Sequence, residues 1–204
     1  MEEKRNFDLL TLGQVLLRLS PPNNDRLVRG DTFVKQVGGA ELNVAVGVAL
    51  LGLRTGVISK LPSHDMGSFM KGKIRSYGVS DDFFMYDDSP SARVGIYYYE
   101  NGAYPRKPKV IYDRANSSFY SLKIDEIPEK AYTASRCFHT SGITLALSPK
   151  VRETTIEMIK RFKAQGAIIS FDVNFRGNLW TGAEAKECIE SILPYVDIFF
   201  CSED

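Results

Sequence analysis

Three short segments of this 204-residue chain carry residues that suit the binding of a polar small molecule. In the first, the pair Gly38-Gly39 stands where a turn leads into a helix, and its backbone can approach a ligand because glycine has no Cβ. Asn43 follows at the expected helix entrance, where its amide can cap the helix or hold a hydroxyl group. Taken alone, this pattern is equally consistent with a tight turn followed by a helix cap.

The other two segments are Ser141-Gly142 and the run from Asp172 to Arg176. In the latter, Asn174 offers a second amide for hydroxyl groups, and Arg176 offers a planar guanidinium that suits a carboxylate or a phosphate. Asp172 can orient a water, a hydroxyl or the neighbouring loop. The alternatives are that Arg176 caps a helix end or pairs with Asp172.

Short apolar segments alternate with longer stretches of helical periodicity along the chain. Strands are expected at 7–12, 55–61, 135–140, 167–173 and 196–201, and helices at 43–51, 65–77, 150–164 and 182–193. This alternation predicts a parallel sheet covered by helices on both faces, with right-handed crossovers. Ligands of such sheets bind beyond the carboxyl ends of the strands, so the three segments are expected to converge on one crevice.

Two stretches do not follow this alternation. Val15–Gln36 is rich in turn residues and contains only short strand pieces. Arg93–Glu100 and Lys109–Tyr112 are expected to form a hairpin with Asn101-Gly102 at its turn. Bulky side chains alternate onto both faces of its first strand, which predicts a small sheet that is covered on both sides.

The segments that carry these residues also point to a family. They are Gly38-Gly39-Ala40-Glu41-Leu42-Asn43, then His139 to Pro149, then Ser170 to Arg176. In this order and at these separations they resemble the PfkB/ribokinase-like carbohydrate kinases, and within that family most of all the 2-keto-3-deoxygluconate kinases. The likeness runs from Leu12-Gly13 to Phe200-Cys201-Ser202-Glu203. The Gly-Gly-Ala-Glu-x-Asn and Asp-Val-Asn-x-Arg segments together are fairly specific for the sugar-acid branch.

The resemblance implies a ribokinase-like fold, in which a small inserted β-sheet forms a lid over the sugar and often a dimer contact. It also implies that Gly39, Tyr97, Tyr112, Arg114 and Arg176 contact a sugar acid. With Asn43 and Asn174 these residues make up the expected substrate-binding set. The alternatives are that the two tyrosines only pack the hairpin and that Arg114 is a solvated surface charge.

The chain departs from the broad family at several positions. Glu41 stands where many sugar kinases carry a small residue, although Glu is usual in the keto-deoxygluconate branch. Gln14 stands where Glu usually follows the first-strand glycine. Leu61-Pro62-Ser63-His64 replaces a commoner Val-Gly-x-Asp turn, which puts the loop geometry in doubt more than the substrate class.

The resemblance further implies ATP and Mg²⁺ as cofactors of the complete enzyme. The family's Gly-Ala-Gly-Asp segment, whose aspartate is the catalytic base, does not occur in this sequence. The base is therefore expected beyond Asp204, and the C-terminal part of the fold is expected to be missing. Ser202 matches a position near the nucleotide and is the one cofactor-binding residue expected here; no catalytic residue and no metal ligand are expected. The 204-residue chain alone is expected to be inactive.

Composition and sequence patterns argue against several other classes of protein. A net charge of +1 without a basic stripe argues against nucleic acid, and no apolar run reaches the ~20 residues that a membrane span needs. The N-terminus does not resemble a secretory signal, so a cytoplasmic protein is expected. Cys137, Cys188 and Cys201 are widely spaced and suggest neither disulfides nor zinc. His139 lies among apolar residues and is expected to be a core histidine rather than a catalytic one.

We therefore expect an incomplete α/β core at 1–14, 37–91 and 115–204, and a β lid at 15–36 and 92–114. The expected parent activity is transfer of the γ-phosphoryl group of ATP to 2-keto-3-deoxygluconate, in a homo-oligomer that contacts through the lid. One alternative is another PfkB-family kinase that acts on fructose or another keto-deoxy sugar. The other is a non-catalytic sugar-binding or assembly fragment.

Overall fold

A parallel sheet of six strands forms the centre of the molecule. The structure is a computed structural model that describes residues 5–202. The strands of this main sheet lie in the order β10-β9-β8-β1-β4-β5, and all neighbouring pairs are parallel. Their bounds are β1 Phe7–Leu12, β4 Thr55–Pro62, β5 Phe84–Asp87, β8 Ser135–Ser141, β9 Ile168–Asp172 and β10 Ile198–Phe200.

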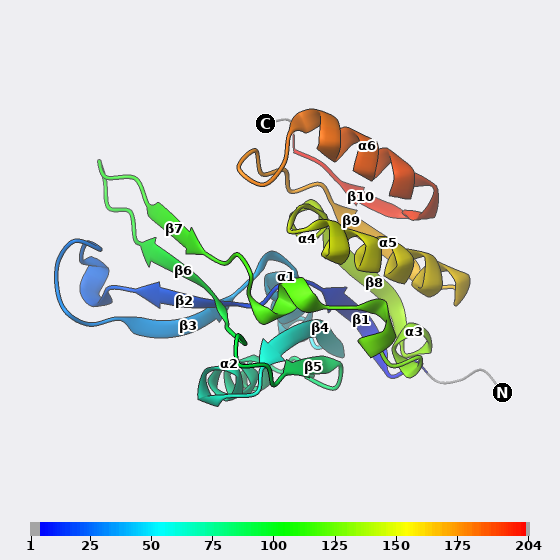
Figure 1. The fold of residues 1–204 in the computed structure, drawn as a ribbon, viewed down its shortest axis with the longest axis horizontal. Coiled ribbons are helices and arrows are strands. Elements are labelled where there is room, and N and C mark those ends of the chain that lie inside the picture. The colour runs from blue at the N-terminus through cyan, green and yellow to red at the C-terminus, as the bar shows by residue number, and fades with distance from the viewer. Residues whose placement is uncertain (1–4, 203–204) are drawn as a thin grey trace.

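Helices cover the two faces of the main sheet and enclose two hydrophobic clusters. On one face lie α3, α4, α5 and α6 (Figure 1), which pack against β1, β8 and β9. The rings of Phe138 and Phe162 stack within this cluster. On the other face, α1 and α2 pack against β4 through side chains such as Leu42, Val57 and Met70. The helix bounds are α1 Ala40–Leu50, α2 Asp65–Ser76, α3 Lys130–Thr133, α4 Gly142–Ala146, α5 Pro149–Ala164 and α6 Gly182–Ile192, with 3-10 turns at 22–24, 118–121, 124–126 and 193–195.

The longest helix, α5, shows why the sequence folds this way locally. The Ser148 side chain caps its first turn by accepting from the backbone N–H of Val151 at 3.2 Å, and Pro149 occupies the first helical position. Met158, Ile159 and other buried residues recur at helical spacing on the face that meets the sheet. The expected helix and strand positions of the α/β core are confirmed with boundary shifts of a few residues.

A second, smaller sheet of four strands projects from one side of the main body (Figure 1). Its strands are β2 Leu16–Ser20, β3 Val34–Gly38, β6 Gly95–Glu100 and β7 Lys109–Asp113, in the order β3-β2-β6-β7. The β2–β6 pair is parallel and the two outer pairs are antiparallel, so this small sheet is mixed. The expected hairpin is confirmed as β6 and β7.

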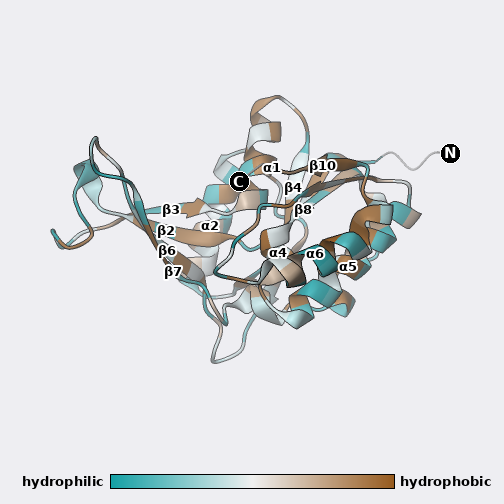
Figure 2. Cartoon of the chain, turned by 90° about the horizontal axis from the view of Figure 1, so that it is seen from above, coloured by the Kyte–Doolittle hydropathy of each residue, from teal (hydrophilic) through white to brown (hydrophobic). Residues whose placement is uncertain are grey.

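Two expectations about the hairpin are wrong. Its turn is not the Asn101-Gly102 pair, because the chain continues past it and folds back between Ala103 and Arg106, which exchange backbone hydrogen bonds of 3.0 and 2.7 Å. The sheet is also not covered on both sides, since every residue of β7 is exposed. Figure 2 shows hydrophilic residues concentrated in the loops at the outer end of this sheet, where the hairpin ends.

The strand β10 lies at the edge of the main sheet and exposes apolar side chains. Ile198, Phe199 and Phe200 are 43%, 45% and 55% exposed.

Among the described residues, no helix is long and apolar enough to cross a membrane.

Candidate functional site

A cavity of about 480 Å³ lies where the small sheet meets the carboxyl ends of the parallel strands. All seven residues of the expected substrate-binding set line it, namely Gly39, Asn43, Tyr97, Tyr112, Arg114, Asn174 and Arg176. Gln14, Leu16, Arg18, Ala40, Glu41, Tyr99, Val110 and Ile143 complete the lining. Two of the three expected segments reach the cavity, through Gly39 and through Asn174 and Arg176, whereas Ser141-Gly142 does not line it and only the following Ile143 does. The role of these residues in substrate binding stays a prediction.

The two glycines let the start of α1 approach the rest of the cavity closely. Gly39 has φ 148°, a conformation that residues with a Cβ rarely adopt, and a Cβ there would lie 2.7 Å from the carbonyl oxygen of Gln14. A Cβ on Gly38 would collide with the hydroxyl of Tyr97. Because α1 begins at Ala40, Asn43 lies one turn inside the helix and does not cap it, contrary to one expectation; its side chain is exposed at the cavity.

Glu41 is buried beneath the cavity floor and joins three elements. Its exposed fraction is 2%, and its Oε1 accepts hydrogen bonds from the hydroxyls of Ser141 at 2.5 Å and Thr144 at 2.7 Å. Ser141 in turn caps α4, because its Oγ accepts from the backbone N–H of Ile143. The carboxylate therefore holds α1, β8 and α4 at fixed positions around the cavity.

Arg114 is held by Gln14 rather than solvated at the surface. Its Nε donates to Oε1 of Gln14 at 2.7 Å, and Gln14 donates from Nε2 to Oγ of Ser117 at 2.6 Å. Burial lowers the pKa of Arg114, and the neighbouring positive charge of Arg176 acts in the same direction. Arg114 remains a cation under all ordinary conditions, so it presents a positive charge whose direction is set by the protein.

The tyrosines form an aromatic wall on the small sheet. Tyr97 and Tyr112 are cross-strand partners whose ring centroids lie 6.0 Å apart. Burial raises the pKa of Tyr97, and the charge of nearby Arg18 opposes that rise. Tyr112 is half exposed, and the guanidinium of Arg114 lies 5.6 Å from its ring centroid. The pair packs within the hairpin and faces the cavity at the same time, so the two interpretations of these residues are compatible.

The loop after β9 brings Asn174 and Arg176 to the opposite side of the cavity. Oδ1 of Asp172 accepts from the backbone N–H of Asn174 at 3.0 Å, which helps to hold Asn174 at a positive φ of 37°. Asp172 thus orients the loop, one of its three expected roles. Arg176 is exposed and donates from Nη1 to the carbonyl of Phe175 at 2.8 Å; among the residues described it forms no ion pair with Asp172.

His139 is a core histidine, as expected. Its exposed fraction is 4%, and Nδ1 lies 3.0 Å from Oγ of Ser170. Burial lowers the pKa of His139, although the negative charges of Glu41 and Asp172 act in the opposite direction. A buried imidazole that already has a partner is not placed to act on a ligand.

The eight other lining residues were not expected from the sequence to form part of the site. Among them, Gln14 and Glu41 were noted only as departures from the family, and Arg18 was not noted at all. The contacts of Gln14 and Glu41 join positions about a hundred residues apart, which no local pattern reveals. The sequence did contain a signal for Arg18: it lies between the apolar residues Leu17 and Leu19, and in a strand this alternation predicts that Arg18 points to the opposite face.

Ser202, the expected cofactor-binding residue, lies beyond β10 and is exposed, and it does not line the cavity. Glu203 and Asp204 lie outside the described residues, as does the expected catalytic base. Within residues 5–202, no group of three or more His, Cys, Asp or Glu side chains is placed to hold a metal ion.

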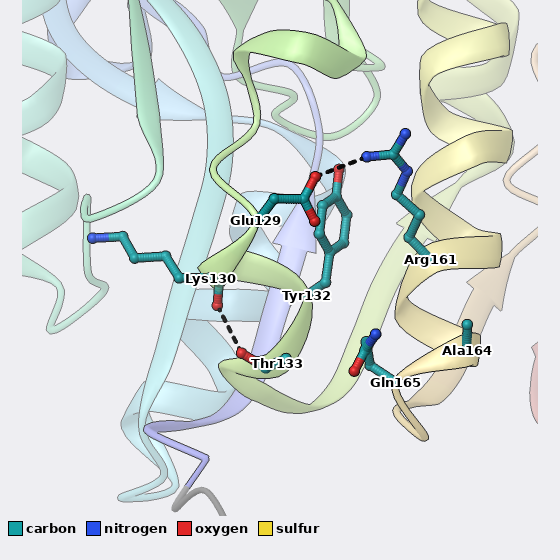
Figure 3. Close-up of a pocket in the computed structure, with 7 residues that line it drawn as sticks. All are labelled: Glu129, Lys130, Tyr132, Thr133, Arg161, Ala164 and Gln165. Atoms are coloured by element: carbon teal, nitrogen blue, oxygen red, sulfur yellow. Dashed lines mark hydrogen bonds and ion pairs between the residues drawn. The ribbon is translucent and has the colours of Figure 1, made fainter.

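A second cavity, of about 430 Å³, lies between α3 and α5 (Figure 3). Arg161 in its lining forms two ion pairs: Nη1 lies 3.1 Å from Oε1 of Glu129, which also lines the cavity, and Nε lies 2.8 Å from Oε1 of Glu157 on the same helix. Tyr132 packs edge-on against Phe162 at 5.2 Å between ring centroids. These contacts join two helices, so we interpret this cavity as structural.

The fold and the site together define an α/β protein with a polar, positively charged ligand cavity at the carboxyl edge of its main sheet, bordered by a small mixed sheet. The family model for pfkB family carbohydrate kinases matches residues 6–204. The chain belongs to this family.

Individual relatives agree with this assignment. The chain is 37% identical over 196 residues to 2-dehydro-3-deoxygalactonokinase of Haloferax volcanii, which covers 96% of this chain and 61% of the relative. It is 30% identical to 2-dehydro-3-deoxygluconokinase of Bacillus subtilis, over 95% of this chain and 60% of the relative. The crystal structure of 2-dehydro-3-deoxygluconokinase from Thermotoga maritima superposes with a TM-score of 0.89 at 36% identity, covering 94% of this chain and 58% of that one. The chain thus spans about 60% of the length of these relatives.

Proposed function

We propose that this protein serves the ATP-dependent phosphorylation of a 2-keto-3-deoxy sugar acid, with 2-keto-3-deoxygluconate as the expected substrate. The observation that carries the proposal is the meeting of Arg114 and Arg176 in one cavity, from the small sheet and from the loop after β9. Two guanidinium groups that approach from different elements suit a carboxylate, which neutralises their mutual repulsion. The names of the relatives support the same substrate class.

The remaining lining residues would hold the uncharged part of the sugar acid. Asn43 and Asn174 offer amides to its hydroxyl groups, and the backbone at Gly39 can approach it closely. Tyr97 and Tyr112 would cover the carbon chain from the small sheet. In this proposal residues 15–36 and 92–114 act as a lid that excludes water from the reacting hydroxyl.

MgATP would supply the phosphoryl group that a primary hydroxyl of the sugar acid accepts. The described residues do not gather a set of donors that fits a triphosphate, since Ser202 alone lies at the expected position and is exposed. We further propose that the 204-residue polypeptide binds the sugar acid without turning it over, because its sequence contains no Gly-Ala-Gly-Asp segment to supply the base.

A second candidate substrate within this function is the epimer of 2-keto-3-deoxygluconate at C4. The Haloferax volcanii relative is named for 2-dehydro-3-deoxygalactonate, which differs from the gluconate only in configuration at C4. Asn43 and Asn174 are two side chains on the cavity wall whose amides can distinguish the orientation of one hydroxyl. Calorimetric titration of the purified protein with both epimers would rank them.

Neutral sugars provide the test of the substrate class. We expect 2-keto-3-deoxygluconate to bind at least tenfold more tightly than 3-deoxyfructose, in which a hydroxymethyl group replaces the carboxylate, since a charge-assisted hydrogen bond contributes ~1.5–3 kcal/mol. Equal affinities would favour the alternative of a fructose-type kinase. Binding of neither sugar would favour an assembly role without a sugar site.

A cytoplasmic location and a homo-oligomeric state belong to this proposal as well, and analytical ultracentrifugation tests the latter.

A further inference from the structure

Arg18 is a cavity residue that the proposed function does not yet use. It lies on β2, whose side chains alternate between two environments. Leu17 and Leu19 pack in the hydrophobic cluster of α1 and α2, whereas Leu16 and Arg18 point to the other face and line the cavity. Arg18 therefore faces the same space as Arg114 and Arg176.

The guanidinium of Arg18 is held in place by two contacts. Its Cζ lies 4.2 Å from the centroid of the Tyr99 ring, and its Nε donates to Oγ of Ser20 at 2.9 Å. A stacked guanidinium with one fixed N–H loses little conformational entropy when a ligand binds to its other donors. An arginine that served only to keep the lid soluble would need neither contact.

The charges around the cavity do not balance. Three lining residues are arginines, and the one acidic residue in the lining, Glu41, already accepts hydrogen bonds from Ser141 and Thr144. The lowering of the Arg114 pKa by the charge of Arg176 reflects the same excess of positive charge. A bound anion relieves this repulsion, and each cation that faces the anion adds to its selection over a neutral molecule.

The sheet register places Arg18 away from the other two arginines. Arg18 is the cross-strand neighbour of Tyr97, which pairs in turn with Tyr112, so the three residues form one row across the small sheet. Arg114 follows two residues after Tyr112, at the end of β7, and Arg176 follows β9 of the main sheet. An anion between the sheets would thus be approached from three directions.

We infer that Arg18 is a third anion-contacting residue, which binds the sugar acid through its Nη groups and raises the selectivity of the cavity for acids over neutral sugars. The inference rests on the proposed function, and it adds a specificity-determining residue from the lid to the two arginines already assigned.

The test compares the affinities of an acid and its neutral counterpart in matched variants. Isothermal titration calorimetry with 2-keto-3-deoxygluconate and with 3-deoxyfructose is carried out on the purified 204-residue protein, on Arg18→Gln and on Arg18→Lys. Arg29→Gln is the control, because Arg29 is exposed on the same small sheet's β2–β3 connection and does not line the cavity. Thermal unfolding of each variant shows whether it folds.

We expect Arg18→Gln to weaken binding of the acid about tenfold, the effect of one charge-assisted contact, and to change binding of the neutral sugar by less than about twofold. Arg18→Lys keeps the charge but not the planar fork, so it should lose about threefold for the acid, and it remains informative if the Gln variant does not fold. Arg29→Gln should match the unmodified protein.

Three results would overturn the inference. Unchanged acid affinity in Arg18→Gln would show that the residue does not contact the anion. Equal losses for both sugars would assign it a structural role in the lid. If the unmodified protein itself does not distinguish the two sugars, the proposed sugar-acid function fails, and the role of Arg18 fails with it; this outcome needs no variant and is therefore distinguishable from the first two.

Discussion

The buried carboxylate of Glu41 offers the sharpest test of how the cavity is held together. Both of its hydrogen bonds reach the same atom, since the hydroxyls of Ser141 and Thr144 each donate to Oε1, at 2.5 and 2.7 Å. Glu41→Gln can therefore keep both bonds if its amide oxygen occupies the position of Oε1. What is lost is the charge on the acceptor, while the geometry is retained.

The magnitude follows from the number and kind of these bonds. A hydrogen bond to a charged group contributes ~1.5–3 kcal/mol and a neutral one ~0.5–1.5 kcal/mol, so Glu41→Gln should lower the free energy of unfolding by about 1 kcal/mol per bond, or ~2 kcal/mol in all. Glu41→Ala removes both bonds and leaves two buried hydroxyls without an acceptor, which should cost ~3–6 kcal/mol. For a chain of this length each kcal/mol corresponds to ~2–4 °C in Tm.

The assay is urea unfolding followed by circular dichroism, with the unmodified protein and Glu157→Gln as references. Glu157 is a partly exposed carboxylate that pairs with Arg161 one helical turn away, so its substitution should change the unfolding free energy very little. If both Glu41 variants unfold at the same urea concentration as the unmodified protein, the carboxylate does not join α1, β8 and α4 as described. If Glu41→Gln is as damaging as Glu41→Ala, the two hydroxyls do not share one acceptor atom.

Three further predictions concern the site and its surroundings. Arg176→Ala should weaken binding of 2-keto-3-deoxygluconate roughly ten- to hundredfold in calorimetry, and an unchanged affinity would contradict its assignment to the carboxylate. Gly39→Ala should destabilise the protein by ~1–3 kcal/mol in urea unfolding, because of the positive φ and the contact of the new Cβ with Gln14. Gly47→Ala, where a Cβ in the middle of α1 meets open space, should stabilise the protein by ~0.5–1 kcal/mol. Similar effects at both positions would refute the argument. Burial holds the pKa of His139 below the 6.5 of an exposed histidine, so the unfolded state binds the proton first as the pH drops. The free energy of unfolding should therefore fall between about pH 7 and pH 5, and His139→Gln should flatten this dependence. An unchanged slope in the variant would contradict the prediction.

The sequence alone determined most of the α/β core, because its signals are local. The strand at Phe7–Leu12 was predicted with the bounds that the structure has, and the helix Asp65–Ser76 differs from its prediction by one residue. Alternating and helical periodicities reflect burial of one side of a segment, which neighbouring residues encode. The short helix α4 and the strand β5 were not predicted, since five and four residues are too few to show a period.

The place of Asn174 and Arg176 was also predictable, for a topological reason. The carboxyl ends of parallel strands meet at the edge of a sheet where ligands bind, and these two residues follow β9 at that edge. Gly39 and Asn43 follow β3 of the small sheet instead, so this rule does not place them. The resemblance to carbohydrate kinases added Tyr97, Tyr112 and Arg114, which stand on the small sheet and follow no such rule.

Only the tertiary structure decided which side chains hold that site in place and which charged residues face the cavity. Gln14 orients Arg114 across a separation of 100 residues, and Glu41 accepts from Ser141 across the same separation. Arg18 joins the cavity because β2 pairs in parallel with β6, a register that depends on strands far apart in the sequence. Contacts of this kind depend on how whole elements pack, and no spacing within one segment records that packing.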